Sequence, residues 1–461
     1  MEINEILVAL MFLTFCGFLF TGFPVAYVLG GVGVLFTVVG YYSDIYLGTL
    51  TGLDYMTLGM AVNRVYKYMD NWVLVALPMF IFMGLMLDHS GIAEKMMKAM
   101  QDLFGKVRGG LAVTVTIIGV ILAASTGIIG ASVVLLGLLS LPAMLKQGYS
   151  KSLALGTIAG SGTLGILIPP SIMLVIMADQ LGLSVGDLFM GALMPGVLLG
   201  GLYVAFILIY SLFRPKAAPL SPDRRKLQWS MAWSVFKTIL PPAALIMAVL
   251  GSIFAGITTP TEASGVGALG ATLLAAFNKR LSFKVIKEVI FACFNTTAYI
   301  FAIFLGATTF ALVLRSLGGD GVIEATLTSI PLGPHGIMAV ILGVVFILGF
   351  FLDWIEITLI VLPLLAPVVS SLGIHVNGYG VVENPELVWF VILVAVSLQT
   401  SFLTPPVGFA LFYLKGVCPP DVQLIDIYKG VVPFICLQLI GLLLVAMWPQ
   451  LVIWLPAIAY R

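Results

Sequence analysis

The sequence predicts an all-α integral membrane protein built as an inverted-topology repeat with two re-entrant helical hairpins. Three observations lead to this fold class: an apolar composition, a proline interruption that occurs twice, and an odd number of predicted membrane crossings in each half. Hydrophobic residues make up 61% of the 461 residues, charged residues make up 9%, and the mean hydropathy is +1.14. Because soluble domains carry about 25% charged residues, this chain is expected to lie in a lipid bilayer.

Apolar runs long enough to cross a bilayer, about 18 residues or more, recur along the whole chain. The runs 110–146 and 336–371 are too long for one straight crossing, and each contains a break signal, S-T-G-I-I-G at 125–130 and G-F-F-L-D-W-I-E at 349–356. Each is therefore predicted to be one discontinuous crossing. The predicted helices lie near 6–21, 23–42, 72–88, 110–146, 189–213, 238–257, 258–278, 289–314, 336–371 and 426–455.

A Pro-Pro pair interrupts an apolar segment at two places, and these places mark the two predicted hairpins, 150–180 and 386–417. The pairs Pro169–Pro170 and Pro405–Pro406 lie 236 residues apart. Proline removes a backbone donor and frees carbonyl groups within a helix, which hydrocarbon tolerates only where they are buried in protein or line a cavity. Matched interruptions in two halves indicate the binding site of a secondary transporter. The alternative is that these prolines only kink helices.

The interruptions belong to a predicted repeat of two halves, residues 1–213 and 238–461, joined by the basic inter-repeat loop 214–237. Pro24 and Pro260, which also differ by 236 positions, each open a glycine-rich helix. Five crossings and one hairpin in each half would insert the second half upside down relative to the first. This is an arrangement expected of secondary transporters.

Loop charges predict the orientation, because cytoplasmic loops carry an excess of Lys and Arg. The segments 88–108, 214–237 and 279–288 carry 14 Lys and Arg and are assigned to the cytoplasmic side, together with Lys415 and Lys429. Both termini then lie outside. Segment 88–108 is predicted to be an amphipathic helix in the membrane interface, and a miscounted crossing there would invert the first half. The opposite side is assigned Arg64, Lys67, Lys146, Lys151, Arg315 and Arg461.

Polar residues cluster beside the two Pro-Pro pairs. Hydroxyl groups, a side-chain amide and freed carbonyls form an uncharged, oxygen-rich lining that suits a monovalent cation, while the N-termini of half-helices suit an anionic group. The candidate binding residues near the hairpin tips are Ser161, Gly162, Thr163, Pro169, Pro170, Ser171, Gln399, Thr400, Ser401, Thr404, Pro405 and Pro406.

The two discontinuous crossings supply the second group of candidates. Ser125, Thr126 and Gly127 lie at the break in the first half, and Gly349, Asp353 and Glu356 lie at the break in the second. A charged residue within a membrane span is costly and points to function. Asp353 and Glu356 could bind a cation, pair with a basic group or carry a proton. The alternative is that they lie in water at a helix end.

Other residues have simpler interpretations. Glu262, Asp187 and Asp426 are expected at helix starts, and the isolated histidines His89, His335 and His375 are expected in loops. The four cysteines lack metal or redox spacing, and the net charge of +1 argues against nucleic-acid binding. The chain contains no phosphate-binding loop of the G-x-x-x-x-G-K-[ST] type and no nucleophile–base arrangement, so it is not expected to be an enzyme or an ATP-driven pump.

Five motifs, in order along the chain, resemble the large membrane subunit of a tripartite ATP-independent periplasmic (TRAP) transporter. They are G-F-P-V-A near 22, G-I-L-I-P-P-S at 165–171, G-L-S-V-G-D-L-F at 182–189, G-I-T-T-P-T-E-A at 256–263 and T-S-F-L-T-P-P-V-G at 400–408. The segments F-L-D-W-I-E-I and L-Q-T-S-F-L-T-P-P-V-G resemble the mannitol/chloroaromatic subgroup, which includes transporters of 2-oxo acids.

The resemblance implies an importer in the bacterial inner membrane that works with a small four-helix membrane subunit. A periplasmic binding protein would deliver an organic acid, a sodium gradient would drive uptake, and the hairpins would move as an elevator against a scaffold. Sodium ions would bind near the hairpins and broken helices, and the expected ligands are Ser161, Thr163, Asp353, Thr400 and Thr404.

Three alternatives remain at this point. Paired hairpins also occur in stand-alone divalent-anion/sodium symporters and anion exchangers, and freed backbone can form the filter of an ion channel. A membrane-embedded enzyme is the last alternative.

Overall fold

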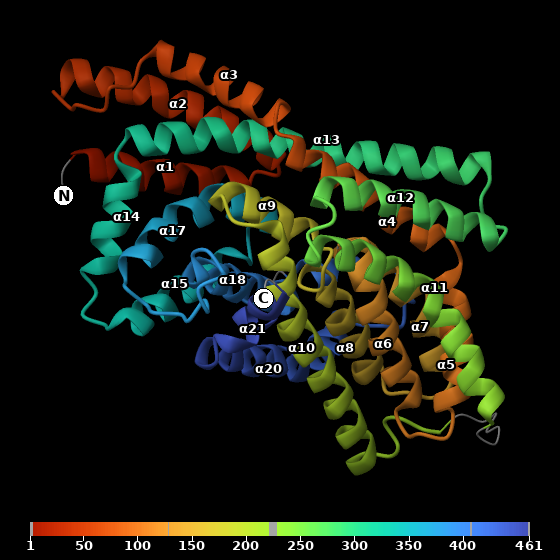
Figure 1. Ribbon diagram of the computed structural model, residues 1–461. Helices are drawn as coiled ribbons and strands as arrows, with labels where there is room; N and C mark the ends of the chain where they lie inside the picture. Colours follow the sequence, from red (N-terminus) through yellow and green to blue (C-terminus); the bar gives the residue numbers. More distant parts are fainter. Residues whose placement is uncertain (1–2, 128, 221–227, 406–407, 460–461) are drawn as a thin grey trace. The chain divides into compact units, whose positions relative to one another are not determined.

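The computed structural model contains only helices in the residues that it describes (Figure 1). It describes residues 3–127, 129–220, 228–405 and 408–459, with only the backbone described at 123–126. Within these residues, 9 helices are long and apolar enough to cross a membrane. The predicted class, an all-α multi-pass membrane protein, is confirmed at this level.

The chain divides into two compact units, and each draws on both halves of the sequence. Unit 1 comprises Met1–Leu74 and Asn295–His375, and unit 2 comprises Val75–Phe294 and Val376–Arg461. The long helix α13 (Phe283–Ser316) runs through one of the boundaries. The predicted repeat is a symmetry between the two halves of the sequence, whereas the two units are defined by which residues pack together. The division into units therefore does not test the predicted repeat.

Unit 1 is formed by the first three helices and a later group. These are α1 (Ile3–Leu19), α2 (Val25–Tyr46), α3 (Tyr55–Met69), most of α13, α14 (Gly319–Thr328), α15 (Pro334–Leu348), α16 (Trp354–Glu356), the π-helix η3 (Ile357–Val361) and α17 (Leu362–Ser371).

Unit 2 contains the remaining helices, and the short 3-10 helix η1 (Trp72–Val75) leads into it. They are α4 (Ala76–His89), α5 (Ile92–Phe104), α6 (Gly110–Thr126), α7 (Ile129–Lys146), α8 (Lys151–Thr163), η2 (Leu164–Ile166), α9 (Ile172–Leu181), α10 (Val185–Phe213), α11 (Trp229–Phe254), α12 (Pro260–Phe277), α18 (Pro385–Leu403), α19 (Phe409–Gly416), α20 (Leu424–Met447) and α21 (Gln450–Ala459).

All four predicted interruptions are present. Helix α6 ends at Thr126, and Gly127 follows it with φ +59, a left-handed conformation that favours glycine. The second break separates α15 from α16, and the Pro-Pro segments separate α8 from α9 and α18 from α19. The local sequence therefore predicted where these helices break.

Segment 150–180 does not double back as a hairpin, so this prediction is wrong. Helix α10 runs antiparallel to the whole segment. The Ser150 backbone N–H donates to the Ala217 carbonyl beyond the end of α10 (2.9 Å), and Gly196 packs against Ile168 further along. A short turn then joins α9 to the start of α10. Helices α8 and α9 therefore form one broken crossing.

Segment 386–417 is also a broken crossing rather than a hairpin. At the start of α18, Trp389 Nε1 donates to the carbonyl of Val445, near the end of α20 (2.9 Å). At the end of α19, Lys415 Nζ donates to the carbonyl of Val422, just before α20 begins (2.5 Å). Because these contacts lie at opposite ends of α20, α18 and α19 follow one another across unit 2.

The hairpin of unit 2 is the run 110–146, which the sequence suggested was a discontinuous crossing. Helix α6 runs parallel to α8, because the Leu111 N–H donates to the Tyr149 hydroxyl (3.3 Å) and the Ser161 hydroxyl to Thr116 Oγ1 (3.2 Å). Helix α7 returns antiparallel to α8, with Val133 packed against Gly162. Break signals mark where a helix stops, whereas tertiary packing decides in which direction the chain continues.

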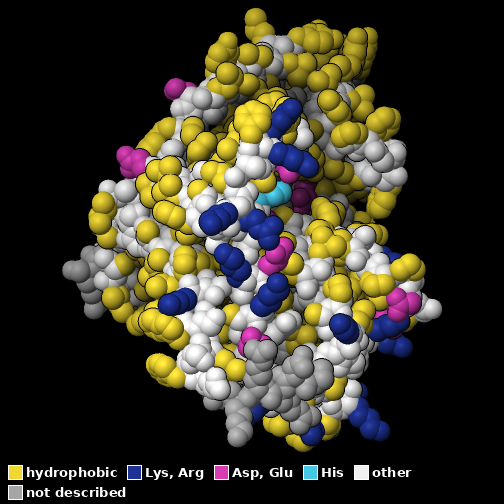
Figure 2. Space-filling view, turned by 90° about the vertical axis from the view of Figure 1, so that its right-hand side faces the viewer, with side chains coloured by type: hydrophobic (Ala, Val, Ile, Leu, Met, Phe, Trp, Pro, Cys, Tyr) yellow, Lys and Arg dark blue, Asp and Glu magenta, His cyan; other side chains and the backbone are white. Residues whose placement is uncertain are grey.

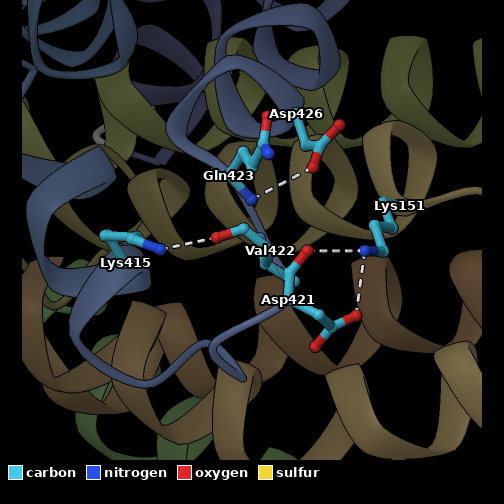
Figure 3. A network of polar contacts seen from close by, with 6 residues as sticks. All are labelled: Lys151, Lys415, Asp421, Val422, Gln423 and Asp426. Atoms are coloured by element: carbon cyan, nitrogen blue, oxygen red, sulfur yellow. Dashed lines mark hydrogen bonds and ion pairs between the residues drawn. The ribbon is translucent and has the colours of Figure 1, made fainter.

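The orientation of α8 also corrects the predicted positions of two lysines. Gln147 Nε2 donates to the Pro219 carbonyl (3.2 Å), so Lys146 and Lys151 lie at the same end of unit 2 as residues 214–220, the described first part of the basic loop. They were assigned to the opposite side. Lys151 also forms an ion pair with Asp421 (2.9 Å) beside the start of α20 (Figure 3). This hydrogen-bonded pair raises the pKa of Lys151 and lowers the pKa of Asp421.

The remaining basic segments of unit 2 share this end, which we call the basic end. Arg280 contacts Glu94 (3.2 Å) and joins segments 279–288 and 88–108, and Gly109 lies against Ser211. As predicted, 88–108 contains an amphipathic helix, α5, which buries Met96 and exposes Glu94. Figure 2 shows Lys and Arg side chains gathered on one face of the molecule.

Three helices were missed or merged. Helices α3 and α14, two short helices with charged residues and weak apolar patterns, are not predicted from the sequence. The predicted helix 426–455 is two helices, because α20 ends at Met447 and α21 starts at Gln450. Pro449 explains this division, since proline restricts the preceding residue to extended conformations.

Candidate functional site

The first broken crossing places its polar residues in the interior of unit 2. Helix α8 can run close beside α20 because Gly156 and Gly430 face each other, and a Cβ atom on either would collide with the other helix. Ser161 and Thr163 are fully buried. The Ser161 hydroxyl donates to Thr116 Oγ1 on α6, and the Thr163 hydroxyl donates to the Gly160 carbonyl (2.9 Å).

The tip of the α6–α7 hairpin meets the break between α8 and α9. A Cβ atom on Gly127 would lie 3.3 Å from the backbone nitrogen of Ile172, the first residue of α9. Ser171 caps this helix and donates to the Ile166 carbonyl (2.5 Å). Two predicted groups of residues are thus brought together, around Gly127 and around Ser161–Ser171 with the buried Gly162, Pro169 and Pro170. The side chains of Ser125 and Thr126 lie outside the described part.

The hydroxyl groups at the second break donate to carbonyls of their own helix. Thr400 donates to Val396 (2.8 Å), Ser401 to Leu398 (2.8 Å) and Thr404 to Thr400 (2.7 Å). A hydroxyl oxygen that donates in this way keeps its lone pairs, so these side chains can still coordinate a cation. Pro405 is half-buried, and Pro406 lies outside the described residues.

Gln399, one turn before this break, is fully buried, and neither atom of its amide has a hydrogen bond within the described residues. Tyr203 lies next to the amides of both Gln399 and Gln438, and neither Tyr203 nor Gln438 was among the predicted site residues. Each is a polar residue in an apolar run, and such residues are costly inside a membrane span. This pattern marks each residue by itself but does not indicate that the two lie close together.

The remaining candidates, Gly349, Asp353 and Glu356, belong to unit 1. Buried Gly349 follows α15, and the Asp353 carboxylate accepts from the Trp354 N–H (2.8 Å) at the start of α16. Glu356 is 1% exposed, and neither carboxylate oxygen has a hydrogen bond from the described residues. It precedes the π-helix η3, a form of helix often found at functional sites.

The site predicted from sequence therefore draws on both units. Within unit 2, the structure brings Gly127 to the Ser161–Ser171 group. The candidates Asp353 and Gln399–Thr404 belong to different units, so their contribution to one site stays a prediction.

A cavity of about 200 Å³ lies beside the break in unit 1. Leu348, Phe351 and Leu352 from the break line it together with Phe12 and Cys16 of α1. An apolar cavity of this kind provides no charged partner for a polar substrate.

Several residues with simpler interpretations behave as expected. Glu262 accepts from the Thr259 N–H (2.8 Å) in a capping box, Asp426 accepts from the Gln423 N–H (3.1 Å), and Asp187 lies in the first turn of α10. Two histidines were placed wrongly in loops, since His89 ends α4 and His335 lies in the first turn of α15. The described residues contain no group of three or more His, Cys, Asp or Glu that could hold a metal ion.

Comparison with known proteins supports a transport function. The family model described as "Tripartite ATP-independent periplasmic transporter, DctM component" matches residues 12–451. The C4-dicarboxylate TRAP transporter large permease protein DctM of Vibrio cholerae is 30% identical over 98% of both chains. The isethionate TRAP transporter permease protein DctMQ of Oleidesulfovibrio alaskensis is 27% identical over 92% of this chain and 65% of that protein.

The fold also resembles a solved membrane transporter. The YdaH transporter of Alcanivorax borkumensis matches 83% of this chain and 88% of its own, with a TM-score of 0.53 and 14% identity. These relatives are transporters and not enzymes, as expected from the absence of a catalytic motif. The family match spans nearly the whole sequence, so this chain belongs to the DctM-component family of tripartite ATP-independent periplasmic transporters.

Proposed function

We propose that this chain provides the membrane pathway for sodium-coupled import of a small organic acid delivered by a periplasmic binding protein. The main support is the 30% identity to a C4-dicarboxylate permease over 98% of both chains. The isethionate relative also handles an organic acid. A 2-oxo acid is the proposed substrate class, by resemblance of the segments around Asp353 and Thr404 to the mannitol/chloroaromatic subgroup.

The proposed site combines an anion-binding part with a cation-binding part. The N-terminus of α9 begins at a break inside unit 2 and would attract the acid group of the substrate. The hydroxyl oxygens of Ser161, Thr163, Thr400 and Thr404, all in unit 2, keep lone pairs for a sodium ion. Asp353, in unit 1, is proposed as a sodium ligand from the sequence alone. Because most of these ligands are hydroxyl oxygens, this division of roles does not require a cluster of three or more His, Cys, Asp or Glu side chains.

The crossing directions support an inverted repeat. Helices α8 and α9 run from the basic end of unit 2 to the opposite end, while α18 and α19 run the other way. We pair these two broken crossings with each other and pair the α6–α7 hairpin with segment 334–371 as the second hairpin. In the proposed elevator mechanism, the hairpins and the broken crossings carry the substrate while a scaffold of the remaining helices stays fixed.

The proposed orientation places the basic end of unit 2 in the cytoplasm and both termini in the periplasm, with the protein in the bacterial inner membrane. The proposed partners are a periplasmic binding protein and a small four-helix membrane subunit. The chain covers only 65% of the DctMQ permease, which leaves room in that protein for a fused second membrane part.

Reconstitution tests this proposal. The chain is placed in liposomes with and without the small subunit and the binding protein, and uptake of labelled 2-oxo acids and dicarboxylates is measured under an inward sodium gradient. We expect accumulation only when both partners are present. Uptake by the chain alone would indicate a stand-alone symporter, and substrate-independent currents would indicate a channel.

A further inference from the structure

Four polar side chains from four different helices meet in the interior of unit 2. They are Thr163 on α8, Tyr203 on α10, Gln399 on α18 and Gln438 on α20, and all four are fully buried. Gln438 Nε2 donates a long hydrogen bond to Thr163 Oγ1 (3.4 Å), and the amides of Gln438 and Gln399 face the Tyr203 hydroxyl. Two of the four, Tyr203 and Gln438, have no role in the proposed substrate and sodium site.

Most of the hydrogen-bonding capacity of this polar cluster is unused. The Tyr203 hydroxyl, both amide atoms of Gln399 and Gln438 Oε1 have no direct hydrogen bond of normal geometry within the described residues. A carboxamide offers two N–H donors and an oxygen with two lone pairs, and a phenol can both donate and accept. Since buried polar atoms in folded proteins are almost always paired, the cluster requires a further partner.

Packing holds the Tyr203 ring in place, so its hydroxyl group has little freedom to move toward the neighbouring amides. The Tyr203 ring packs edge-on against Phe434, with ring centroids 5.1 Å apart. Phe434 in turn lies against Gly160, where α8 and α20 approach closely. The polar atoms are thereby enclosed among helices rather than exposed to lipid.

The chemistry of the cluster selects the partner. A cation would satisfy the oxygens but leave the N–H groups of Gln399 and the Tyr203 hydroxyl proton unpaired. Water donates and accepts, and buried water molecules typically make about three hydrogen bonds to polar groups of this kind. We propose that Thr163, Tyr203, Gln399 and Gln438 enclose an internal water site that links the end of α8 to the end of α18.

This water site connects the two broken crossings just before each of them breaks. During transport, the water would keep Thr163 and Gln399 at fixed positions relative to each other. Only this effect of the water site rests on the proposed function. The site itself is tested on the purified protein without substrate, partner proteins or an ion gradient. Failure of the uptake experiment would therefore leave it standing, and its own failure would leave the uptake proposal intact.

The test is a double-mutant cycle on thermal stability in detergent. Tyr203→Phe removes only the hydroxyl, and Gln399→Met and Gln438→Met remove the amides at nearly constant length. We expect each single variant to lower the melting temperature by about 2 °C or more, because each leaves the water and its other partners unsatisfied. Each double variant should lower it by less than the sum of the two single effects, since linked residues are not additive.

Tyr210→Phe on the same helix is the matched control, because Tyr210 lies outside the cluster and should behave neutrally. The proposal is overturned if Tyr203→Phe raises the melting temperature, as removal of an unpaired hydroxyl from a dry interior does, or if the effects simply add. It is also overturned if sodium stabilises the wild type and Tyr210→Phe but not Tyr203→Phe, because the occupant would then be the cation.

Discussion

Glu356 carries a carboxylate into the interior of unit 1 without a hydrogen bond from the described residues. A buried charge without a partner destabilises a folded protein by roughly several kcal/mol. The buried Glu356 carboxylate therefore requires a proton or a bound cation to neutralise its charge. We expect Glu356→Gln to keep or raise the melting temperature in the absence of sodium and to lower sodium-driven uptake by about tenfold or more. The exposed residue Glu324 in the same unit provides the control, Glu324→Gln. Wild-type uptake in Glu356→Gln would show that the carboxylate has no part in coupling.

Thr404 and Asp353 flank the breaks that are proposed to bind sodium. Thr404→Ala removes a hydroxyl oxygen that is free to accept, and Asp353→Ala removes a carboxylate, so both should raise the sodium concentration for half-maximal uptake more than they reduce expression. Thr326→Ala is the matched control for Thr404, because the Thr326 hydroxyl also donates to a carbonyl of its own helix (2.6 Å) but is exposed. If both site variants keep the wild-type sodium midpoint in proteoliposomes, the assignment of these residues is wrong.

The sequence identified the polar residues beside each break because hydroxyl groups, glycine and proline stand out in apolar runs. It did not identify Tyr203 and Gln438. Each lies within an apolar stretch of a long helix that carries other polar residues as well, and only the packing of α10 and α20 against α8 and α18 brings them to Thr163 and Gln399. Contacts between helices far apart in sequence cannot be read from local pattern.

At the scale of helices, close packing of α8 on α20 depends on two glycines. A Cβ atom on Gly430 would collide with the carbonyl of Ser152. We expect Gly430→Ala to destabilise the protein by about 1–3 kcal/mol, as overpacked interiors do, and to lower the melting temperature. In Gly201→Ala the added Cβ meets no atom within 4 Å, so this variant should be neutral or stabilising. Equal melting temperatures for the two variants would contradict the close approach.

The same contacts explain what the sequence could not predict about the helices. Proline and glycine fixed the positions of the four breaks, and these were correct. Whether the chain turns back or continues after a break depends on long-range partners, such as Ala217 for Ser150 and Val445 for Trp389. The assignment of hairpin and broken crossing was reversed in unit 2 for this reason.

At the scale of the whole molecule, the corrected directions change which loops share a side. Single cysteines replacing Lys151, Lys216 or Asp421 in a chain without its four native cysteines should react with a membrane-impermeant maleimide from the same side, which we expect to be the cytoplasm. A cysteine replacing the exposed Glu383 should react from the other side, because it precedes α18 at the opposite end of unit 2. Labelling of positions 151 and 216 from different sides would restore the orientation predicted from sequence.

A sodium gradient is proposed to drive the import of an organic acid supplied by a binding protein. The most direct measurement is uptake of a labelled 2-oxo acid or dicarboxylate into proteoliposomes that contain the chain and its small membrane subunit, with the cognate binding protein outside. We predict accumulation above the external concentration under an inward sodium gradient and none when potassium replaces sodium. Equal accumulation with either cation would show that sodium does not drive uptake, and accumulation without the binding protein would show that this partner is not required.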